Sequence, residues 1–253
     1  MNNALLKDQK ICGMQTVQAV LAKRNASVKY LAFTKEWSRE LGPVCSQLAK
    51  DKRSYAMLDD AELTELAKTS EHGGVVAICA AFGLKRTSVS DLKDWQKTQE
   101  HWVVLDGIRD PHQMASIVKT AAIYGVKHIF IPNNSLECFY HPLTWRYSEG
   151  LFESLIFYRL STIGGWCRMA EPYCLTIAGL PTGCGGRNIV WDKVPQAPGR
   201  PWALIIGGDA QQVDGKSIAH HCELTVQLPH VTKDLPLEVM AGTLLCWLSS
   251  KWH

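Results

Sequence analysis

The stretch "LDGIRDPHQMASIVKTAAIYG", residues 105–125, carries polar side chains that could do chemistry at the start of a helix. It has no glycine between Gly107 and Gly125, so it is not a dinucleotide-binding or phosphate-binding loop. It offers instead the amide of Gln113 and the amine of Lys119. An amide can orient a substrate by hydrogen bonds, and a desolvated lysine can act as a base. A solvated lysine on a helix face explains Lys119 equally well.

The segments around this stretch predict a βαβ unit. Residues 101–106, "HWVVLD", indicate a buried strand, Asp110 suits the position that caps a helix, and Gly125 suits its end. One apolar stripe lies between them, formed by Met114, Ile117, Val118, Ala121 and Ala122. Residues 126–131 form the next strand. Because such a connection is parallel and right-handed, the turn at 107–113 lies at the carboxyl edge of a sheet, where ligands bind.

The remaining apolar runs extend this α/β pattern. Residues 173–180, 202–208 and 223–229 predict further parallel strands, and 236–252 predict an amphipathic helix. The segment 178–201 is rich in glycine and proline and predicts a long loop above the sheet. A loop of this length in a compact domain is usually functional or disordered.

The N-terminal third predicts a separate small α/β unit. Helices are expected over 11–24, 40–53 (after Pro43) and 60–70, with strands over 28–34, 54–59 and 72–82. Residues 83–100 lose the apolar periodicity, with a short helix near "DLKDWQK". We therefore predict a domain over 1–85, a linker over 86–100 and a second domain over 101–253.

Composition and cysteine usage exclude several classes of protein. A hydrophobic fraction of 46% allows a sizeable core, and no apolar run approaches the roughly 18 residues of a membrane span. The first ten residues contain no apolar signal-peptide core, and the nine dispersed cysteines include no C-x-x-C. A cytoplasmic protein with reduced thiols is expected. His220 and His221 have no second ligand cluster and Cys184 has no identifiable base, so neither a metal nor a cysteine nucleophile is expected.

The net charge of +3 is unevenly distributed along the chain. Residues 1–90 hold 13 Lys and Arg against 9 Asp and Glu, whereas residues 91–253 hold 14 against 15. An anionic partner of the N-terminal domain explains this excess, and so does a solvated surface. The candidate phosphate contacts are Lys23, Arg24, Lys50, Lys52 and Arg53.

Three ordered motifs resemble the signatures of the SpoU-type, or TrmH-like, RNA methyltransferases of the SPOUT superfamily. "VLDGIRDPHQMASIVKTAAIYGV" resembles the first, "ALIIGGDAQQV" (203–213) the second and "LPHVTKDLPLEVMAGTLL" (228–245) the third. Residues 11–79, with "ICGMQTVQAVLAKR" and "EHGGVVAI", resemble the family's small RNA-binding domain, which is similar to a ribosomal protein.

The resemblance implies a fold, a cofactor and a partner. It implies a trefoil-knotted parallel sheet, a homodimer, and transfer of a methyl group from S-adenosylmethionine to a ribose 2′-hydroxyl of tRNA or rRNA. It places the cofactor in the loops that contain Leu180, Pro181, Thr182, Ile206, Gly207, Gly208, Asp209, Leu228, Leu237 and Val239. It assigns the catalytic positions to Lys119, Gln113 and Glu238.

The chain departs from the family signatures at functional positions. Gln113 stands for an asparagine, Lys119 for an arginine and Asp209 for a glutamate, while Pro236 and Glu238 replace an asparagine and a serine. Because proline has no amide hydrogen to donate and Glu238 adds a negative charge, weak or absent cofactor binding is expected. The leading hypothesis is an active 2′-O-methyltransferase. The alternative is a non-catalytic RNA- or ribosome-binding homologue, and an unrelated small-molecule α/β enzyme remains a third, remote hypothesis.

Overall fold

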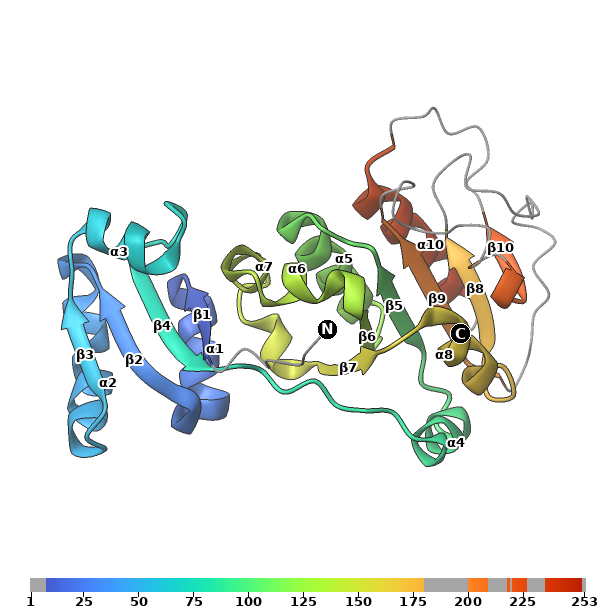
Figure 1. Cartoon of the computed structure of the whole chain (residues 1–253), viewed down its shortest axis with the longest axis horizontal. Coiled ribbons are helices and arrows are strands. Elements are labelled where there is room, and N and C mark those ends of the chain that lie inside the picture. The colour runs from blue at the N-terminus through green and yellow to red at the C-terminus, as the bar shows by residue number, and fades with distance from the viewer. Residues whose placement is uncertain (1–7, 180–199, 209–217, 219, 227–234, 252–253) are drawn as a thin grey trace. The chain divides into compact units, whose positions relative to one another are not determined.

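The computed structural model describes residues 8–179, 200–208, 218, 220–226 and 235–251 (Figure 1). The chain divides into two compact units. The first contains Met1–Gly83 and Tyr140–Ser154, and the second contains Leu84–Phe139 and Leu155–His253.

The first unit is built on a four-stranded sheet in the order β1-β4-β2-β3. Its strands are β1 (Asp8–Cys12), β2 (Val28–Phe33), β3 (Ser54–Met57) and β4 (Val75–Ala80). Strand β4 is antiparallel to β1 and β2, whereas β2 and β3 are parallel. The helices are α1 (Met14–Arg24), α2 (Ser38–Lys50) and α3 (Asp60–Ala67), with 3₁₀ turns at Asn25–Ser27 and Lys35–Trp37.

Two predicted helix starts in this unit are wrong. Ile11 and Cys12 belong to β1, where they pair with Ala77 and Val76, and the helix begins only after Gly13. Gly13 has a φ of 88°, a left-handed conformation that favours glycine and separates strand from helix. Helix α2 begins at Ser38, so that Pro43 lies inside it, because the 3₁₀ turn before it already starts the helical path.

A segment from the second half of the chain completes the first unit. It contains α7 (Pro142–Tyr147) and a 3₁₀ turn at Leu151–Ser154. The Thr16 hydroxyl donates to the carbonyl of Trp145 at 3.0 Å, and Arg24 Nε lies 2.8 Å from the carboxylate of Glu153. Arg24 also donates to the carbonyl of Ala80 at 3.0 Å and lies over the ring of Trp145. These contacts tie 140–154 to α1, an association that the sequence patterns did not predict.

The second unit confirms the predicted parallel sheet. Its six described strands lie in the order β10-β8-β9-β5-β6-β7, and every pairing is parallel. Their bounds are β5 (Trp102–Asp106), β6 (His128–Pro132), β7 (Ile156–Leu160), β8 (Leu175–Gly179), β9 (Trp202–Gly207) and β10 (Leu224–Val226). Strand β7 was not predicted.

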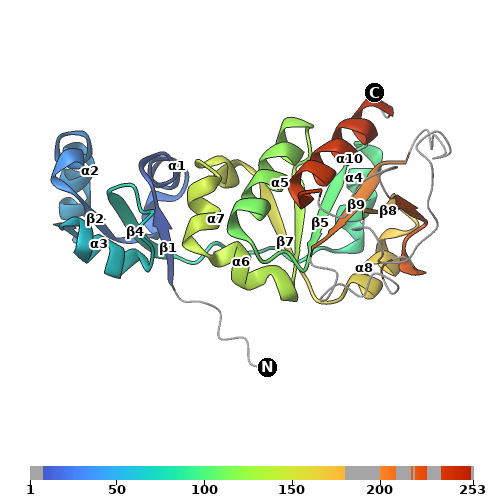
Figure 2. The same ribbon diagram turned by 90° about the horizontal axis from the view of Figure 1, so that it is seen from above.

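Helices cover both faces of this sheet. Helices α4 (Val89–Lys97) and α8 (Ile163–Ala170) pack on the face that contains Trp102, Phe130 and Ile205. The expected linker therefore does contain the predicted short helix, but Leu92 and Trp95 bury it in the core of the second unit. Helices α5 (Pro111–Ile123) and α10 (Leu237–Lys251) pack side by side (Figures 1 and 2). Short helix α6 (Leu136–Tyr140) follows β6.

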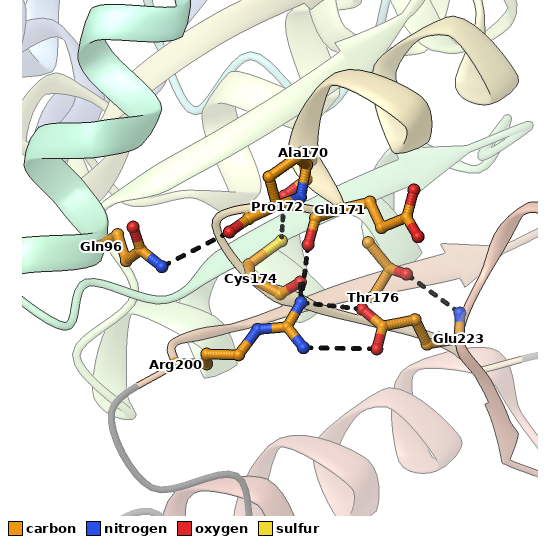
Figure 3. Close-up of polar contacts among 8 residues, drawn as sticks. All are labelled: Gln96, Ala170, Glu171, Pro172, Cys174, Thr176, Arg200 and Glu223. Atoms are coloured by element: carbon orange, nitrogen blue, oxygen red, sulfur yellow. Dashed lines mark hydrogen bonds and ion pairs between the residues drawn. The ribbon is translucent and has the colours of Figure 1, made fainter.

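Arg200 binds residues at the amino ends of β8 and β10, and itself lies just before β9 (Figure 3). These strand ends lie at the edge of the sheet opposite the turn at 107–113. Its Nη2 donates to the carbonyl oxygens of Glu171 and Cys174 at 2.6 and 2.7 Å, and lies 3.0 Å from the carboxylate of Glu223. The amide of Glu223 in turn donates to the hydroxyl of Thr176 at 3.0 Å. These bonds fix where β8, β9 and β10 begin.

Within the described parts of the chain, no helix has both the length and the apolar character needed to cross a membrane.

Candidate functional site

The turn that follows β5 is closed by a serine from the neighbouring strand connection. Ser135, fully buried, donates its hydroxyl to the carbonyl of Leu105 at 2.7 Å and accepts from the amide of Ile108 at 3.0 Å. A four-residue turn usually joins these two groups directly, so the Ser135 hydroxyl is inserted into the turn. Gly107 has a φ of 65°, as the third position of such a turn can require.

An amide from the same connection holds the side chain of Asp106. Asn134 Nδ2 donates to Asp106 Oδ1 at 2.8 Å, and only 5% of Asp106 is exposed. Burial raises the pKa of the Asp106 carboxyl, and the bond from Asn134 lowers it again in part. Both Asn134 and Ser135 belong to the 3₁₀ turn Asn133–Ser135 that directly follows β6.

The end of β9 meets this turn from the other side. The amide of Gly208 donates to the carbonyl of Asp106 at 2.7 Å, and Gly207 pairs with Asp106 across the sheet. A Cβ at position 208 would overlap the carbonyl oxygen of Gly107 and lie 2.8 Å from its carbonyl carbon. Only glycine fits there. The expected cofactor residues Ile206, Gly207 and Gly208 therefore lie, buried, beside the turn that precedes α5.

Helix α5 presents two of the expected catalytic residues. Asp110 caps the helix as predicted, since its carboxylate accepts from the amide of Gln113 at 2.8 Å. The predicted apolar stripe is buried apart from the half-buried Ala122. Gln113 and Lys119 are both half-buried. They lie six residues apart, which is about 9 Å along the helix axis and about 120° around it.

The third expected catalytic residue lies on the adjacent helix. A Cβ on Gly242 would lie 3.7 Å from Thr120 Cγ2, and one turn further Tyr124 hydrogen-bonds Cys246. From the first contact to the second, the residue number rises by four on both helices, so α5 and α10 run parallel. Four residues earlier on each helix, Glu238 is expected to lie beside Ser116. The structure thus places Gln113 and Glu238 in the first turns of two neighbouring parallel helices, with Lys119 further along α5.

Glu238 carries a buried carboxylate oxygen. Its Oε2 is buried and forms no hydrogen bond within the described part of the chain. A buried carboxylate oxygen without a donor costs free energy, so this atom suits a ligand that offers a hydrogen or a positive charge. Leu237 is half-buried and Val239 is 48% exposed in the same turn. Leu180, Pro181, Thr182, Asp209 and Leu228 lie outside the described residues.

The five basic candidates for RNA binding gather at one end of the first unit. Arg53 donates to the carbonyls of Asn25 and Val28, at 2.6 and 3.1 Å, and so joins the end of α2 to the end of α1. It also pairs with Asp51. Arg24 is engaged internally with Glu153. Lys23, Lys50 and Lys52 are exposed at the same end and are therefore the better placed for phosphate.

Metal ligands do not converge in the part of the chain that the structure describes. It contains no group of three or more His, Cys, Asp or Glu side chains suited to a metal ion. The rings of His220 and His221 lie 5.4 Å apart, and Cys184 is outside the described residues.

Sequence reasoning missed Asp106, Asn134 and Ser135 as parts of this site. Asp106 ends β5, and Asn134 and Ser135 lie in the turn that follows β6, so all three lie at the carboxyl edge of the sheet, where ligands gather. Residues 132–136, "PNNSL", contain no motif that singles out Asn134 or Ser135.

Comparisons with known proteins agree with this architecture. Residues 10–83 match the family model described as RNA 2′-O ribose methyltransferase substrate binding. A tRNA/rRNA methyltransferase of Haemophilus influenzae is 29% identical over 145 residues, which cover 57% of this chain but 40% of that relative. This chain therefore spans less than half of that relative's length. The 23S rRNA (guanosine-2′-O-)-methyltransferase RlmB of Photorhabdus laumondii is 21% identical and is covered to 94%, with 93% of this chain.

Solved structures share the fold over nearly the whole chain. An AdoMet-bound rRNA methyltransferase of Sinorhizobium meliloti matches with a TM-score of 0.71 at 16% identity, over 96% of this chain and 87% of that one. The SpoU methyltransferase AviRb of Streptomyces viridochromogenes, solved with AdoMet, matches with a TM-score of 0.68 at 19% identity, over 96% and 90%. In its matched substrate-binding region and in sequence, the chain is similar to the SpoU-type RNA methyltransferases, and it shares their fold.

Proposed function

We propose that this protein transfers a methyl group from S-adenosylmethionine to a ribose 2′-hydroxyl of tRNA or rRNA. The observation that carries the proposal is the junction at the carboxyl edge of the sheet. There the amide of Gly208, at the end of the expected cofactor strand, bonds the turn that leads into α5. The helix that holds Gln113 and Lys119 thus starts beside the cofactor position, as methyl transfer between two bound molecules requires.

The described residues fit the cofactor. Gly208 lets the end of β9 pack directly against the turn before α5, which brings the expected cofactor residues Ile206–Gly208 next to the helix that carries Gln113 and Lys119. The unpartnered Oε2 of Glu238 can accept a hydrogen bond from a bound amine, which would offset the loss of a donor at Pro236. S-Adenosylmethionine, when bound, supplies an electrophilic methyl group on a positively charged sulfur.

The two polar residues of α5 would act on the RNA. Lys119 is the candidate base, because a lysine amine in its neutral form can take the proton of the 2′-hydroxyl. Gln113, at the first turn of α5, offers an amide that can orient the ribose. Glu238, on the adjacent helix, would bind the cofactor, because its buried Oε2 accepts no hydrogen bond from the described residues and could accept one from a bound amine.

The first unit would hold the rest of the RNA. The domain over 1–85, expected to be similar to a ribosomal protein, would bind phosphates through Lys23, Lys50 and Lys52, with Arg24 and Arg53 supporting the fold. The domain over 101–253 would carry the knot, with the cofactor held by the loops expected over 178–183, 206–210 and 228–239. We expect a homodimer through exposed apolar side chains of α5 and α10, with Ile123 81% and Val239 48% exposed.

This dimer surface differs from the one that the sequence predicts, which is formed by the apolar residues Leu244, Leu245, Trp247 and Leu248 of the last helix. Leu244, Leu245 and Leu248 of α10 are fully buried within the single chain, so they belong to the core. The proposed enzyme needs no metal, and we place it in the cytoplasm, where tRNA and rRNA are found.

The catalytic assignment is tested by steady-state kinetics of Lys119→Gln and Gln113→Ala on bulk tRNA and rRNA. Both variants are expected to lower kcat by at least about tenfold, the lower range for removing a positioned acid–base or orienting group. Lys127→Gln is the matched control, because Lys127 is exposed and pairs with Glu100 at the opposite edge of the sheet. Equal activity of Lys119→Gln and Lys127→Gln would remove Lys119 from the mechanism.

A further inference from the structure

The turn at Leu105–Ile108 is held from two sides by groups that are distant in sequence. From one side, Ser135 bridges Leu105 and Ile108, and Asn134 binds the carboxylate of Asp106. From the other side, the amide of Gly208 binds the carbonyl of Asp106. The turn therefore cannot shift without breaking hydrogen bonds to the segments that directly follow β6 and β9.

The position of this turn determines where α5 begins. Arg109 alone separates Ile108, whose amide donates to Ser135, from Asp110. The Asp110 carboxylate caps α5 by accepting a hydrogen bond from the amide of Gln113. A displacement at Asp106 would thus be passed to Gln113 and Lys119, which stand on the rigid helix. A misplacement of about 1 Å between reacting groups can cost about 100-fold in rate.

The side chain of Asp106 depends on Asn134. No charged group of the described residues shifts the pKa of Asp106; burial raises it, and the bond from Asn134 lowers it. The adjacent Asn133 makes different contacts. Its oxygen accepts from Arg159 Nε at 3.1 Å, and its amide lies 3.5 Å from the carbonyl of Ser161. Two asparagines next to each other therefore serve different strand ends, and only Asn134 bonds the turn.

We propose that Asn134 and Ser135 are positioning residues that align α5 with the cofactor strand for methyl transfer. This inference rests on the proposed function. Neither residue touches the reacting atoms; they act through Asp106 and Ile108. Loss of either bond is expected to leave cofactor affinity nearly intact, because Gly208 and Glu238 are unchanged, and to lower the rate of transfer.

The test compares Asn134→Ala and Ser135→Ala with the control Asn133→Ala, all in the full chain. Asn134→Ala and Ser135→Ala are expected to lower kcat on bulk tRNA or rRNA at least tenfold, with KM for RNA and the calorimetric Kd for S-adenosylmethionine changed less than threefold. Asn133→Ala is expected to stay within twofold of the unmodified protein. Equal rates for Asn134→Ala and Asn133→Ala would overturn the proposal, as would a loss confined to Kd.

Asn134→Asp gives a second readout that a purely structural role would not move. Two carboxylates would then face each other at Asp106 and position 134, and only a shared proton restores the hydrogen bond. The activity of Asn134→Asp should therefore rise relative to the unmodified protein as pH falls from 8 to 6. The exchanged pair Asp106→Asn with Asn134→Asp should recover the rate at pH 8. A flat ratio over this range contradicts the proposal.

Hydrogen exchange separates this inference from the proposed function. In Asn134→Ala, protection of the amides in 105–113 should fall, while Asn133→Ala should leave it unchanged. If the unmodified protein transfers no methyl group to any RNA, the proposed function fails. Hydrogen exchange alone then tests whether Asn134 and Ser135 hold the turn at 105–108 in place. Unchanged protection of 105–113 in Asn134→Ala would then overturn this inference.

Discussion

The amide of Gly208 and the carbonyl oxygen of Asp106 lie 2.7 Å apart, and this bond joins the end of β9 to the turn before α5. The approach is possible only because Gly208 has no side chain. Asp106 and Gly208, which are far apart in the sequence, thereby join at the carboxyl edge of the sheet. The candidate cofactor residues and the candidate substrate residues lie next to each other at this edge.

Gly208→Ala should damage this edge. The new Cβ would meet backbone atoms that cannot rotate away, and overpacking of this kind costs about 1–3 kcal/mol. Urea unfolding should show this loss, and calorimetry should show weaker binding of S-adenosylmethionine. Gly242→Ala is the control, because its Cβ meets Thr120 at an ordinary 3.7 Å. That change lies inside helix α10 and should stabilise the protein by about 0.5–1 kcal/mol. Equal free energies of unfolding for the two variants would show that the backbone around Gly208 moves enough to accommodate the new Cβ.

Arg24 should contribute to stability more than to RNA binding. Glu153 is 3% exposed and Arg24 19%, and removal of one partner of a buried pair costs about 3–5 kcal/mol. Arg24→Ala should therefore lower the free energy of unfolding strongly, whereas Lys23→Ala, at an exposed neighbouring position, should change it by less than about 0.5 kcal/mol. If both variants unfold at the same urea concentration, the internal role of Arg24 is refuted.

The three exposed lysines of the first unit should bind RNA phosphates. Changing Lys23, Lys50 and Lys52 together to Gln should weaken binding of all RNA sequences alike. The slope of log affinity against log salt should fall by about 0.7–0.9 for each phosphate that is no longer neutralised. The matched control changes Lys93, Lys97 and Lys127, which are exposed in the second unit. If the control triple variant loses as much RNA affinity as the variant of the first unit, Lys23, Lys50 and Lys52 are not the specific phosphate contacts.

His128 should make the protein less stable in mild acid. Burial lowers its pKa, which the hydrogen bond with Glu100 at 2.6 Å only partly offsets, and Lys127 and Lys85 lower it further. The folded state therefore binds fewer protons than the unfolded chain, and stability is lost as pH falls below the unfolded value of about 6.5. Denaturant unfolding from pH 7.5 to 5 should show this loss, and His128→Gln, which keeps a donor for Glu100, should flatten it. An unchanged slope in His128→Gln would contradict this origin.

The regular elements of the second unit were predictable because their patterns are strong. The strand over 102–106 is a nearly continuous apolar run. The helix that begins at Pro111 has an N-terminal capping residue and an apolar stripe. The elements between residues 132 and 172 were less predictable, since α6, α7 and the 3₁₀ turns are short and β7 is a five-residue strand interrupted by the charged Arg159. The helix expected at Ile11 failed because pairing with β4 overrode local periodicity.

The candidate site was only partly predictable for a related reason. Gln113, Lys119 and Glu238 stand in motifs, and the pairing of α5 with α10 brings them together. Asn134 and Ser135 act through hydrogen bonds across the sheet to Asp106 and Ile108, and such contacts leave no spacing in the sequence. Likewise Arg24 resembled a phosphate contact, because the distant Glu153 that binds it could not be inferred from local composition.

The most direct test of the proposed function is transfer of a labelled methyl group from S-adenosylmethionine to bulk tRNA and rRNA by the full chain. The RNA would then be digested to nucleosides. We predict label in a 2′-O-methylated nucleoside, with transfer reduced at least about tenfold in Lys119→Gln. RNA that is bound but carries no label, under conditions in which the cofactor is saturating, would contradict the enzyme and leave a non-catalytic RNA-binding homologue.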